Sequence, residues 1–215
     1  TGVQTCALPI SFVFFTVFAQ WGIGGVLALT VCQSGRKRKF SAVQYRMLAL
    51  RFWIITVLGS CASLAHLGSP EGAYRSLTGL EISWLSREVA AFIVLNGVMF
   101  CWLLLCWFKP VQRAVILLGG ATALVGLGTI LVTSQVYYQM PLHPLWHSAA
   151  TPVAFLGTAF LTGFMSIAVV RAYWHLPSST ICNAGIVIGI VLSASALGIR
   201  YQVPGADASS PLLWW

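Results

Sequence analysis

Two side chains that can exchange protons lie 22 positions apart in the sequence. His66 ends one long apolar run and Glu88 opens the next. An imidazole and a carboxylate are costly to keep at the edge of a hydrocarbon layer, and burial can tune both for proton exchange near neutral pH. The pair is therefore a candidate site for oxidising a lipid-soluble quinol, whose protons must be accepted while its electrons leave in another direction.

The same two residues also have a simpler interpretation. Glu88 can be a residue at the start of a helix, favoured there by the helix dipole, with Ser86 as the N-cap. His66 can be an interfacial residue that makes one hydrogen bond to the backbone. The residues alone leave both interpretations open.

The elements that must position these side chains are membrane-spanning helices. The chain has 215 residues, of which 58% are hydrophobic and 7% are charged, whereas a soluble domain carries about 25% charged residues. Apolar runs of roughly 20 residues are long enough to cross a bilayer as helices, and they lack the alternation of barrel strands. We predict an all-α, polytopic transmembrane bundle with about six spans, at Ser11–Cys32, Leu48–Ala65, Val89–Phe108, Ala114–Val136, Thr151–Val170 and Ile181–Ile199.

The distribution of basic residues predicts the orientation of the spans. The net charge is +8, but most basic residues lie in the short segments after the first, third and fifth spans, so the bilayer is the expected partner and nucleic acid is not. The positive-inside rule places these segments in the cytoplasm and the N-terminus outside. Arg51, near the start of the second span, is expected to extend its side chain to the cytoplasmic surface.

Other kinds of site find less support in the sequence. The six cysteines form no C-x-x-C pair, and four acidic residues are too few for a carboxylate-lined metal cage. We therefore expect no bound metal or other cofactor in the chain itself. A haem b-type anchor would need two histidines on facing helices, but His143 and His147 lie in a segment broken by prolines and His175 lies in a loop. A small secondary transporter remains an alternative, although no internal repeat is evident.

Glycines and aromatic residues have expected structural roles. The glycines of the first and fourth spans, among them Gly24, Gly120 and Gly128, are expected to allow close helix approach. Trp102 and Tyr137 are expected to lie in interfacial aromatic belts.

The two ends of the sequence differ from its middle. Residues 1–10 resemble a translated artefact and are expected to be a non-native leader. Residues 202–215 read as a loop followed by the start of a further span, and the chain is expected to be a fragment. The predicted division is therefore 1–10, a transmembrane anchor domain at 11–201, and 202–215.

The segment from His66 to Val89, HLGSPEGAYRSLTGLEISWLSREV, closely resembles the signature of the dimethyl sulfoxide reductase anchor subunit family, the DmsC type. The likeness is most specific in its H-L-G-x-P and S-W-L-S-R-E elements. Over the rest of the chain it is a looser likeness in the pattern of spans.

This resemblance implies a fold of eight spans, of which six are present, without a haem of its own. It implies a multi-pass subunit of a respiratory oxidoreductase complex in the bacterial inner membrane, which is not catalytic alone. The partners would be a molybdopterin catalytic subunit and an iron–sulfur subunit that receives the electrons of menaquinol. The quinol-site histidine falls on His66 and the essential acidic residue on Glu88. Arg75 and Arg87 would tune Glu88 or dock the iron–sulfur subunit, with plain solvation at the surface as the alternative, and Arg75 is counted with the quinol-binding residues.

Overall fold

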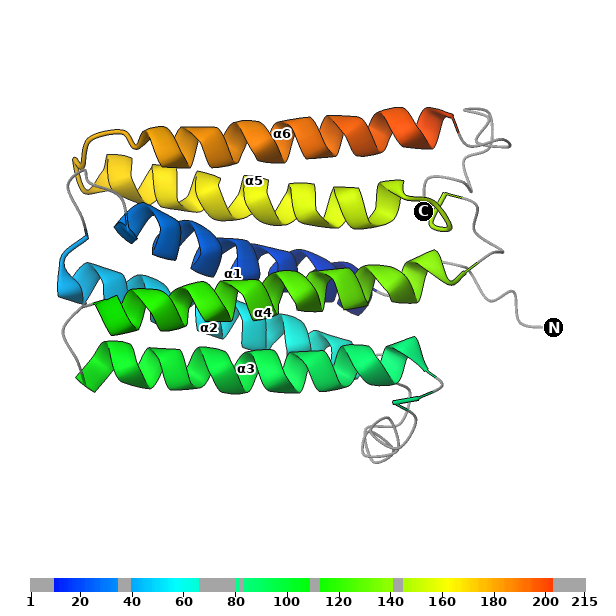
Figure 1. Ribbon diagram of the computed structural model, residues 1–215, viewed down its shortest axis with the longest axis horizontal. Helices are drawn as coiled ribbons and strands as arrows, with labels where there is room; N and C mark the ends of the chain where they lie inside the picture. Colours follow the sequence, from blue (N-terminus) through cyan, green and yellow to red (C-terminus); the bar gives the residue numbers. More distant parts are fainter. Residues whose placement is uncertain are drawn as a thin grey trace.

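The protein is a bundle of long α-helices, as the computed structural model in Figure 1 shows. The structure describes residues 10–34, 40–65, 80–81, 83–108, 113–140 and 145–202. Six helices lie in these ranges, and each is long and apolar enough to cross a membrane. This confirms the predicted all-α transmembrane fold. The helices are α1 (Ile10–Ser34), α2 (Ala42–Ala65), α3 (Trp84–Phe108), α4 (Arg113–Tyr138), α5 (Ala150–Tyr173) and α6 (Thr180–Tyr201).

Several helices begin earlier than the apolar runs predict. α2 starts at Ala42, six residues before Leu48, and α3 starts at Trp84, five residues before Val89. A run of apolar residues ends at the first polar or charged side chain, whereas a helix continues into the interfacial layer, where long side chains reach water. The predicted N-cap at Ser86 is wrong for this reason, because the hydroxyl of Ser83 accepts the N–H of Ser86 at 3.5 Å.

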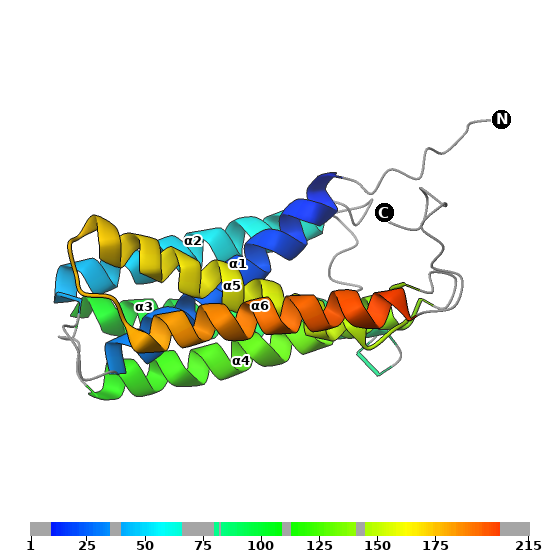
Figure 2. The same cartoon turned by 90° about the horizontal axis from the view of Figure 1, so that it is seen from above.

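Successive helices run in opposite directions, so α2 ends and α3 begins at the same end of the bundle, on the right in Figure 1. α1 is the central helix and packs against α2, α5 and α4, with a smaller contact to α6. Figure 2 shows α1 crossing the bundle obliquely. α2 and α5 both contact α1 but do not contact each other in the described part of the chain.

The contact between α1 and α5 brings backbone against backbone. A Cβ atom added to Gly24 would lie 1.8 Å from the carbonyl oxygen of Ala159, and one added to Gly163 would lie 2.1 Å from the carbonyl carbon of Gly24. Small residues permit such close approach between membrane helices, so the expectation for Gly24 is confirmed. Gly120 and Gly128 have no atom within 4 Å of an added Cβ, so the expectation for these two was wrong.

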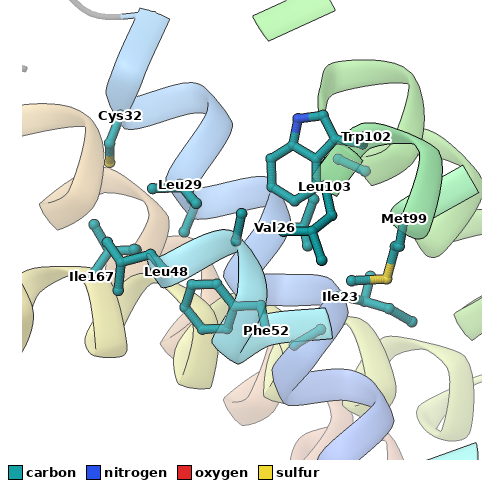
Figure 3. Close-up of a cluster of buried hydrophobic side chains, with 14 of the residues drawn as sticks. Ile23, Val26, Leu29, Cys32, Leu48, Phe52, Met99, Trp102, Leu103 and Ile167 are labelled. Carbon is teal, nitrogen blue, oxygen red and sulfur yellow. The ribbon is translucent and has the colours of Figure 1, made fainter. Parts of the chain in front are cut away.

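The core is built around α1. Figure 3 shows Ile23, Val26 and Leu29 of α1 surrounded by side chains of α2, α3 and α5. Trp102 of α3 is fully buried, and its indole N–H donates to the carbonyl oxygen of Val115 at 3.1 Å. The prediction that Trp102 lies in an interfacial belt was therefore wrong, because a buried indole is stable where its N–H has a partner.

A reciprocal pair of hydrogen bonds joins the end of α1 to the residues before α2. The side-chain amide of Gln33 donates to the carbonyl oxygen of Phe40 at 3.2 Å, and its oxygen accepts the N–H of Phe40 at 3.0 Å. The ring of Phe40 also lies 5.5 Å from the guanidinium of Arg171. Arg171 in turn donates to the carbonyl oxygen of Pro177 at 2.8 Å. These contacts tie α1, α2 and α5 together at the end of the bundle opposite to Glu88.

We predict that Gly24→Val strongly destabilises the protein, since neither backbone can move without separating α1 from α5. Overpacking typically costs about 1–3 kcal/mol, and backbone contacts should place this variant at the upper end of that range. Thermal unfolding of detergent-purified protein, read as the melting temperature, checks it. Gly128→Val is the matched control and should melt like the wild type. Equal melting temperatures of the two variants would contradict the proposed role of Gly24.

Candidate functional site

Glu88 lies inside the bundle, near the end at which α2 finishes and α3 begins. It is the fifth residue of α3, and its side chain is only 2% exposed. One turn further along, Phe92 packs edge-on against Phe15 of α1, with ring centroids 5.2 Å apart. The interpretation of Glu88 as a dipole-stabilised residue of the first turn does not fit this position, because that effect falls off within the first turn.

The carboxyl of Glu88 faces α4. The hydroxyl of Thr133 lies beside it, and the phenol of Tyr137 is close enough to interact with its charge. Even so, Oε1 of Glu88 and Oγ1 of Thr133 have no hydrogen-bond partner in the described part of the chain. Buried polar atoms are normally paired, and leaving one unpaired costs about 1–3 kcal/mol. Two such atoms on facing helices need an explanation, which makes Glu88 and Thr133 candidates for a functional site.

Aromatic rings close this region on the side of α5. The ring of Tyr137 meets Trp146 edge-on at 5.9 Å and Phe155 at 5.4 Å. Tyr137 is 4% exposed, so its predicted place in an interfacial belt was wrong. The carboxyl thus lies near a phenol that is itself held between two other rings.

Thr133 was not predicted from the sequence and Tyr137 was assigned a different role, although the sequence carries a signal for both. With Thr129 they form a series spaced four residues apart, which places all three on one face of a helix. The hydroxyl of Thr129 donates to the carbonyl oxygen of Val125 at 3.0 Å. This is the common hydrogen bond of a threonine hydroxyl within a helix. Thr133 makes no such bond, and its hydroxyl remains available to Glu88.

Two predicted site residues, His66 and Arg75, lie outside the described residues, so their positions relative to Glu88 stay predictions. α2 is described as far as Ala65, the residue before His66. Because α2 ends where α3 begins (Figure 1), the topology is compatible with the expected approach of His66 to Glu88.

Arg87 has partners other than the Glu88 carboxyl. Its guanidinium donates to the carbonyl oxygens of Leu80 and Glu81, each at 2.9 Å, and lies 4.5 Å from the ring centre of Trp84. These contacts hold residues 80 and 81 against the start of α3. Arg87 therefore has a structural role at the entrance to α3.

A second polar contact joins α2 and α3 two turns from Glu88. The side-chain amide of Asn96 donates to the hydroxyl of Ser60 at 3.0 Å and to the carbonyl oxygen of Phe92 at 2.8 Å. Its Oδ1 is buried without a partner in the described residues. Asn96 was not predicted from the sequence, although a single amide in an otherwise apolar span is itself a signal.

Metal and haem sites find no support in the described ranges. No group of three or more histidine, cysteine or acidic side chains gathers there. His147 contacts the carbonyl oxygen of Tyr138 just before α5 begins, whereas His175 follows the end of α5. A helix of 24 residues is about 36 Å long, so these two histidines cannot share one iron.

We predict that Glu88→Leu leaves the fold as stable as the wild type, or makes it more stable. An apolar side chain of similar size removes a buried polar atom that has no partner. The melting temperature in detergent is the measurement. Phe92→Ala, one turn away, is the positive control and should lose about 3–5 kcal/mol. A large loss of stability in Glu88→Leu would show that the carboxyl serves the fold.

Comparison with known proteins places the chain in a family. The family model described as "DMSO reductase anchor subunit (DmsC)" matches residues 3–203. One chain of the anaerobic dimethyl sulfoxide reductase of Escherichia coli is 33% identical over 156 residues, which are 69% of this chain and 53% of that protein. Its counterpart in Haemophilus influenzae is 33% identical over 192 residues, 82% of this chain and 66% of that protein.

A third relative, one subunit of the sulfite dehydrogenase of Allochromatium vinosum, is 28% identical over 193 residues, 83% of this chain and 59% of that protein. No solved structure matches the chain. These matches span between half and two thirds of the relatives' own length. A family match over nearly the whole sequence and six helices able to span a membrane agree with each other. The chain belongs to the DMSO reductase anchor subunit (DmsC) family.

Proposed function

We propose that this protein is the membrane anchor subunit of a respiratory molybdoenzyme, and that it oxidises menaquinol at Glu88. The observation that carries the proposal is the carboxyl of Glu88, which is 2% exposed and has an unpartnered oxygen inside an apolar bundle, among the residues that the structure describes. A carboxylate in a membrane span is expensive to maintain and usually marks a proton or substrate pathway.

The reaction needs groups that accept protons. Oxidation of one quinol to the quinone releases two electrons and two protons. In the proposed mechanism His66 binds a quinol hydroxyl and accepts its proton, and Glu88 relays a proton to the aqueous phase at that end of the bundle. The electrons leave to an iron–sulfur cluster of the partner subunit. No cofactor of this chain takes part, and menaquinol is the substrate.

The surroundings of Glu88 support a relay. The carboxyl lies beside the Thr133 hydroxyl and near the Tyr137 phenol. Hydroxyl groups both donate and accept hydrogen bonds, so either can pass a proton to or from a carboxylate. The rings of Trp146 and Phe155 pack against Tyr137 on the side of α5.

The family supports a proposal for the partners and the location. Relatives named as chains of anaerobic dimethyl sulfoxide reductase support assembly with a molybdopterin subunit and an iron–sulfur subunit at the bacterial inner membrane. The positive segments after α1, α3 and α5 support an N-terminus on the outer side. The Glu88 end of the bundle then faces the same side.

One relative belongs to a sulfite dehydrogenase, which is a reason to test the direction of electron transfer. A quinone-reducing anchor would use the same two proton-exchanging residues in reverse. Assays with quinol and with quinone, on one preparation, distinguish the two directions.

We predict that Glu88→Gln lowers the rate of menaquinol oxidation about 100-fold in the assembled complex, because an amide cannot carry the proton while keeping nearly the same shape. General acid–base groups contribute about 10²–10⁴-fold. The assay follows oxidation of a soluble menaquinol analogue with an artificial terminal acceptor. Glu81→Gln is the control, since Glu81 is exposed and should leave the rate unchanged. A normal rate in Glu88→Gln would overturn the role of Glu88.

We also predict that His66→Leu abolishes tight binding of a quinol analogue while assembly and membrane anchoring persist. The imidazole is the proposed hydrogen-bond partner of the quinol hydroxyl, and leucine cannot replace it. Binding is measured by quenching of the fluorescence of an inhibitor added to the purified complex. Unchanged binding together with unchanged quinol oxidation would leave the membrane-anchor role intact but remove His66 from the site.

A further inference from the structure

A groove of about 570 Å³ runs along the bundle between α2 and α5, far from Glu88. Because these two helices do not contact each other in the described residues, part of α1 forms the floor. Trp21 lies there, with Leu48, Arg51 and Phe52 on the α2 side and Met165 and Val169 on the α5 side. The groove lies along the middle of α2, from Leu48 to Ile55, whereas Glu88 lies at the end where α2 finishes. The two sites therefore occupy different depths of the bundle.

The walls of the groove are almost entirely apolar. Its one hydroxyl among the described residues, that of Ser166, accepts the indole N–H of Trp21 at 2.7 Å and donates to the carbonyl oxygen of Thr162 at 2.7 Å. That hydroxyl is therefore already engaged on both sides. A molecule bound in the groove must therefore present hydrocarbon to its walls. Arg51 is the one charged side chain that lines the described groove.

Arg51 is an exposed cation within a membrane span. No ion pair or hydrogen bond to it occurs in the described residues, where the acidic side chains, Glu81 and Glu88, lie at the other end of the bundle. The Cα–Cβ bonds of a helix tilt toward its N-terminus, and from Arg51 that direction leads toward Ala42 and the nearer membrane surface. A cation at this depth is costly unless an anion or water meets it.

We propose that this groove is a binding site for an anionic phospholipid of the leaflet in which α2 begins. An acyl chain lies against Trp21, Phe52 and Val169, and the phosphate pairs with Arg51. A guanidinium matches a phosphate with two parallel hydrogen bonds and tolerates partial desolvation better than an ammonium. A neutral quinone would fill the apolar part but would leave the charge of Arg51 uncompensated, which is why a lipid phosphate fits better.

The site is tested by native mass spectrometry of the full chain, purified from membranes in mild detergent with any subunits that accompany it. Phosphatidylglycerol and phosphatidylcholine with identical acyl chains are titrated in parallel. We expect phosphatidylglycerol to bind at least 10-fold more tightly. Arg51→Gln should remove that preference and leave phosphatidylcholine binding unchanged.

Two further variants complete the design. Arg113→Gln removes an exposed arginine at the same end of the bundle but outside the groove, and should bind phosphatidylglycerol like the wild type. Val169→Trp keeps the charge but fills the groove; Val169 is 63% exposed, so the larger ring should be accommodated. This variant should lose phosphatidylglycerol binding, which keeps the test decisive if Arg51→Gln fails to fold.

Three results would overturn the proposal. Wild-type affinity for phosphatidylglycerol in Arg51→Gln or in Val169→Trp would remove the groove from lipid binding. Equal affinity of the wild type for the two lipids would remove the role of charge. Displacement of bound phosphatidylglycerol by a soluble quinone analogue, with Arg51→Gln weakening the binding of the analogue, would identify the groove as a quinone site.

Discussion

The bundle depends on the approach of two backbones, those of α1 and α5, at Gly24 and Gly163. Hydrocarbon solvates a leucine as well as a protein core does, so burial of apolar surface gives little drive for helices to associate in a bilayer. Close contact supplies the dispersion energy instead, and two glycines allow it here. With α5 held this near, α1 becomes the central helix, and α2 and α4 pack against its remaining faces. The positions of α3 and of Glu88 follow from that arrangement.

Polar side chains within such a bundle carry a cost that lipid cannot relieve. Many of the hydroxyls avoid this cost with a hydrogen bond inside their own helix, as Thr129 does by donating to a carbonyl oxygen one turn back in α4. Glu88 and Thr133 retain buried oxygens without a partner in the described ranges, and so do Thr30 and Tyr45 toward the opposite end of the bundle. Glu88 differs from the others because it is the one carboxyl among these unpartnered groups of the described residues. An ionised carboxylate costs far more to bury than a hydroxyl does.

The sequence predicts the number and approximate limits of the spans because their length is set by bilayer thickness rather than by packing. It misplaces the starts of α2 and α3, where a helix continues through polar residues such as Arg46 and Ser86. It identifies Glu88 as unusual, but the direction of its side chain depends on which helices are neighbours. A span that is apolar on every face has no amphipathic signal to indicate its inner side. For this reason Thr133 was missed, and Trp102 was assigned to the membrane surface.

The reciprocal bonds between Gln33 and Phe40 have a consequence for variation among related proteins. They close a ring of protein atoms at the base of the segment that carries Arg36 and its basic neighbours. The position of the start of α2 relative to the end of α1 is thereby fixed by two residues outside that segment. Neither of these two hydrogen bonds involves a basic side chain of that segment. Substitutions that change the number or order of these basic residues therefore leave both bonding groups of Gln33 and Phe40 in place, and the charge of the segment can differ between relatives while this joint is kept.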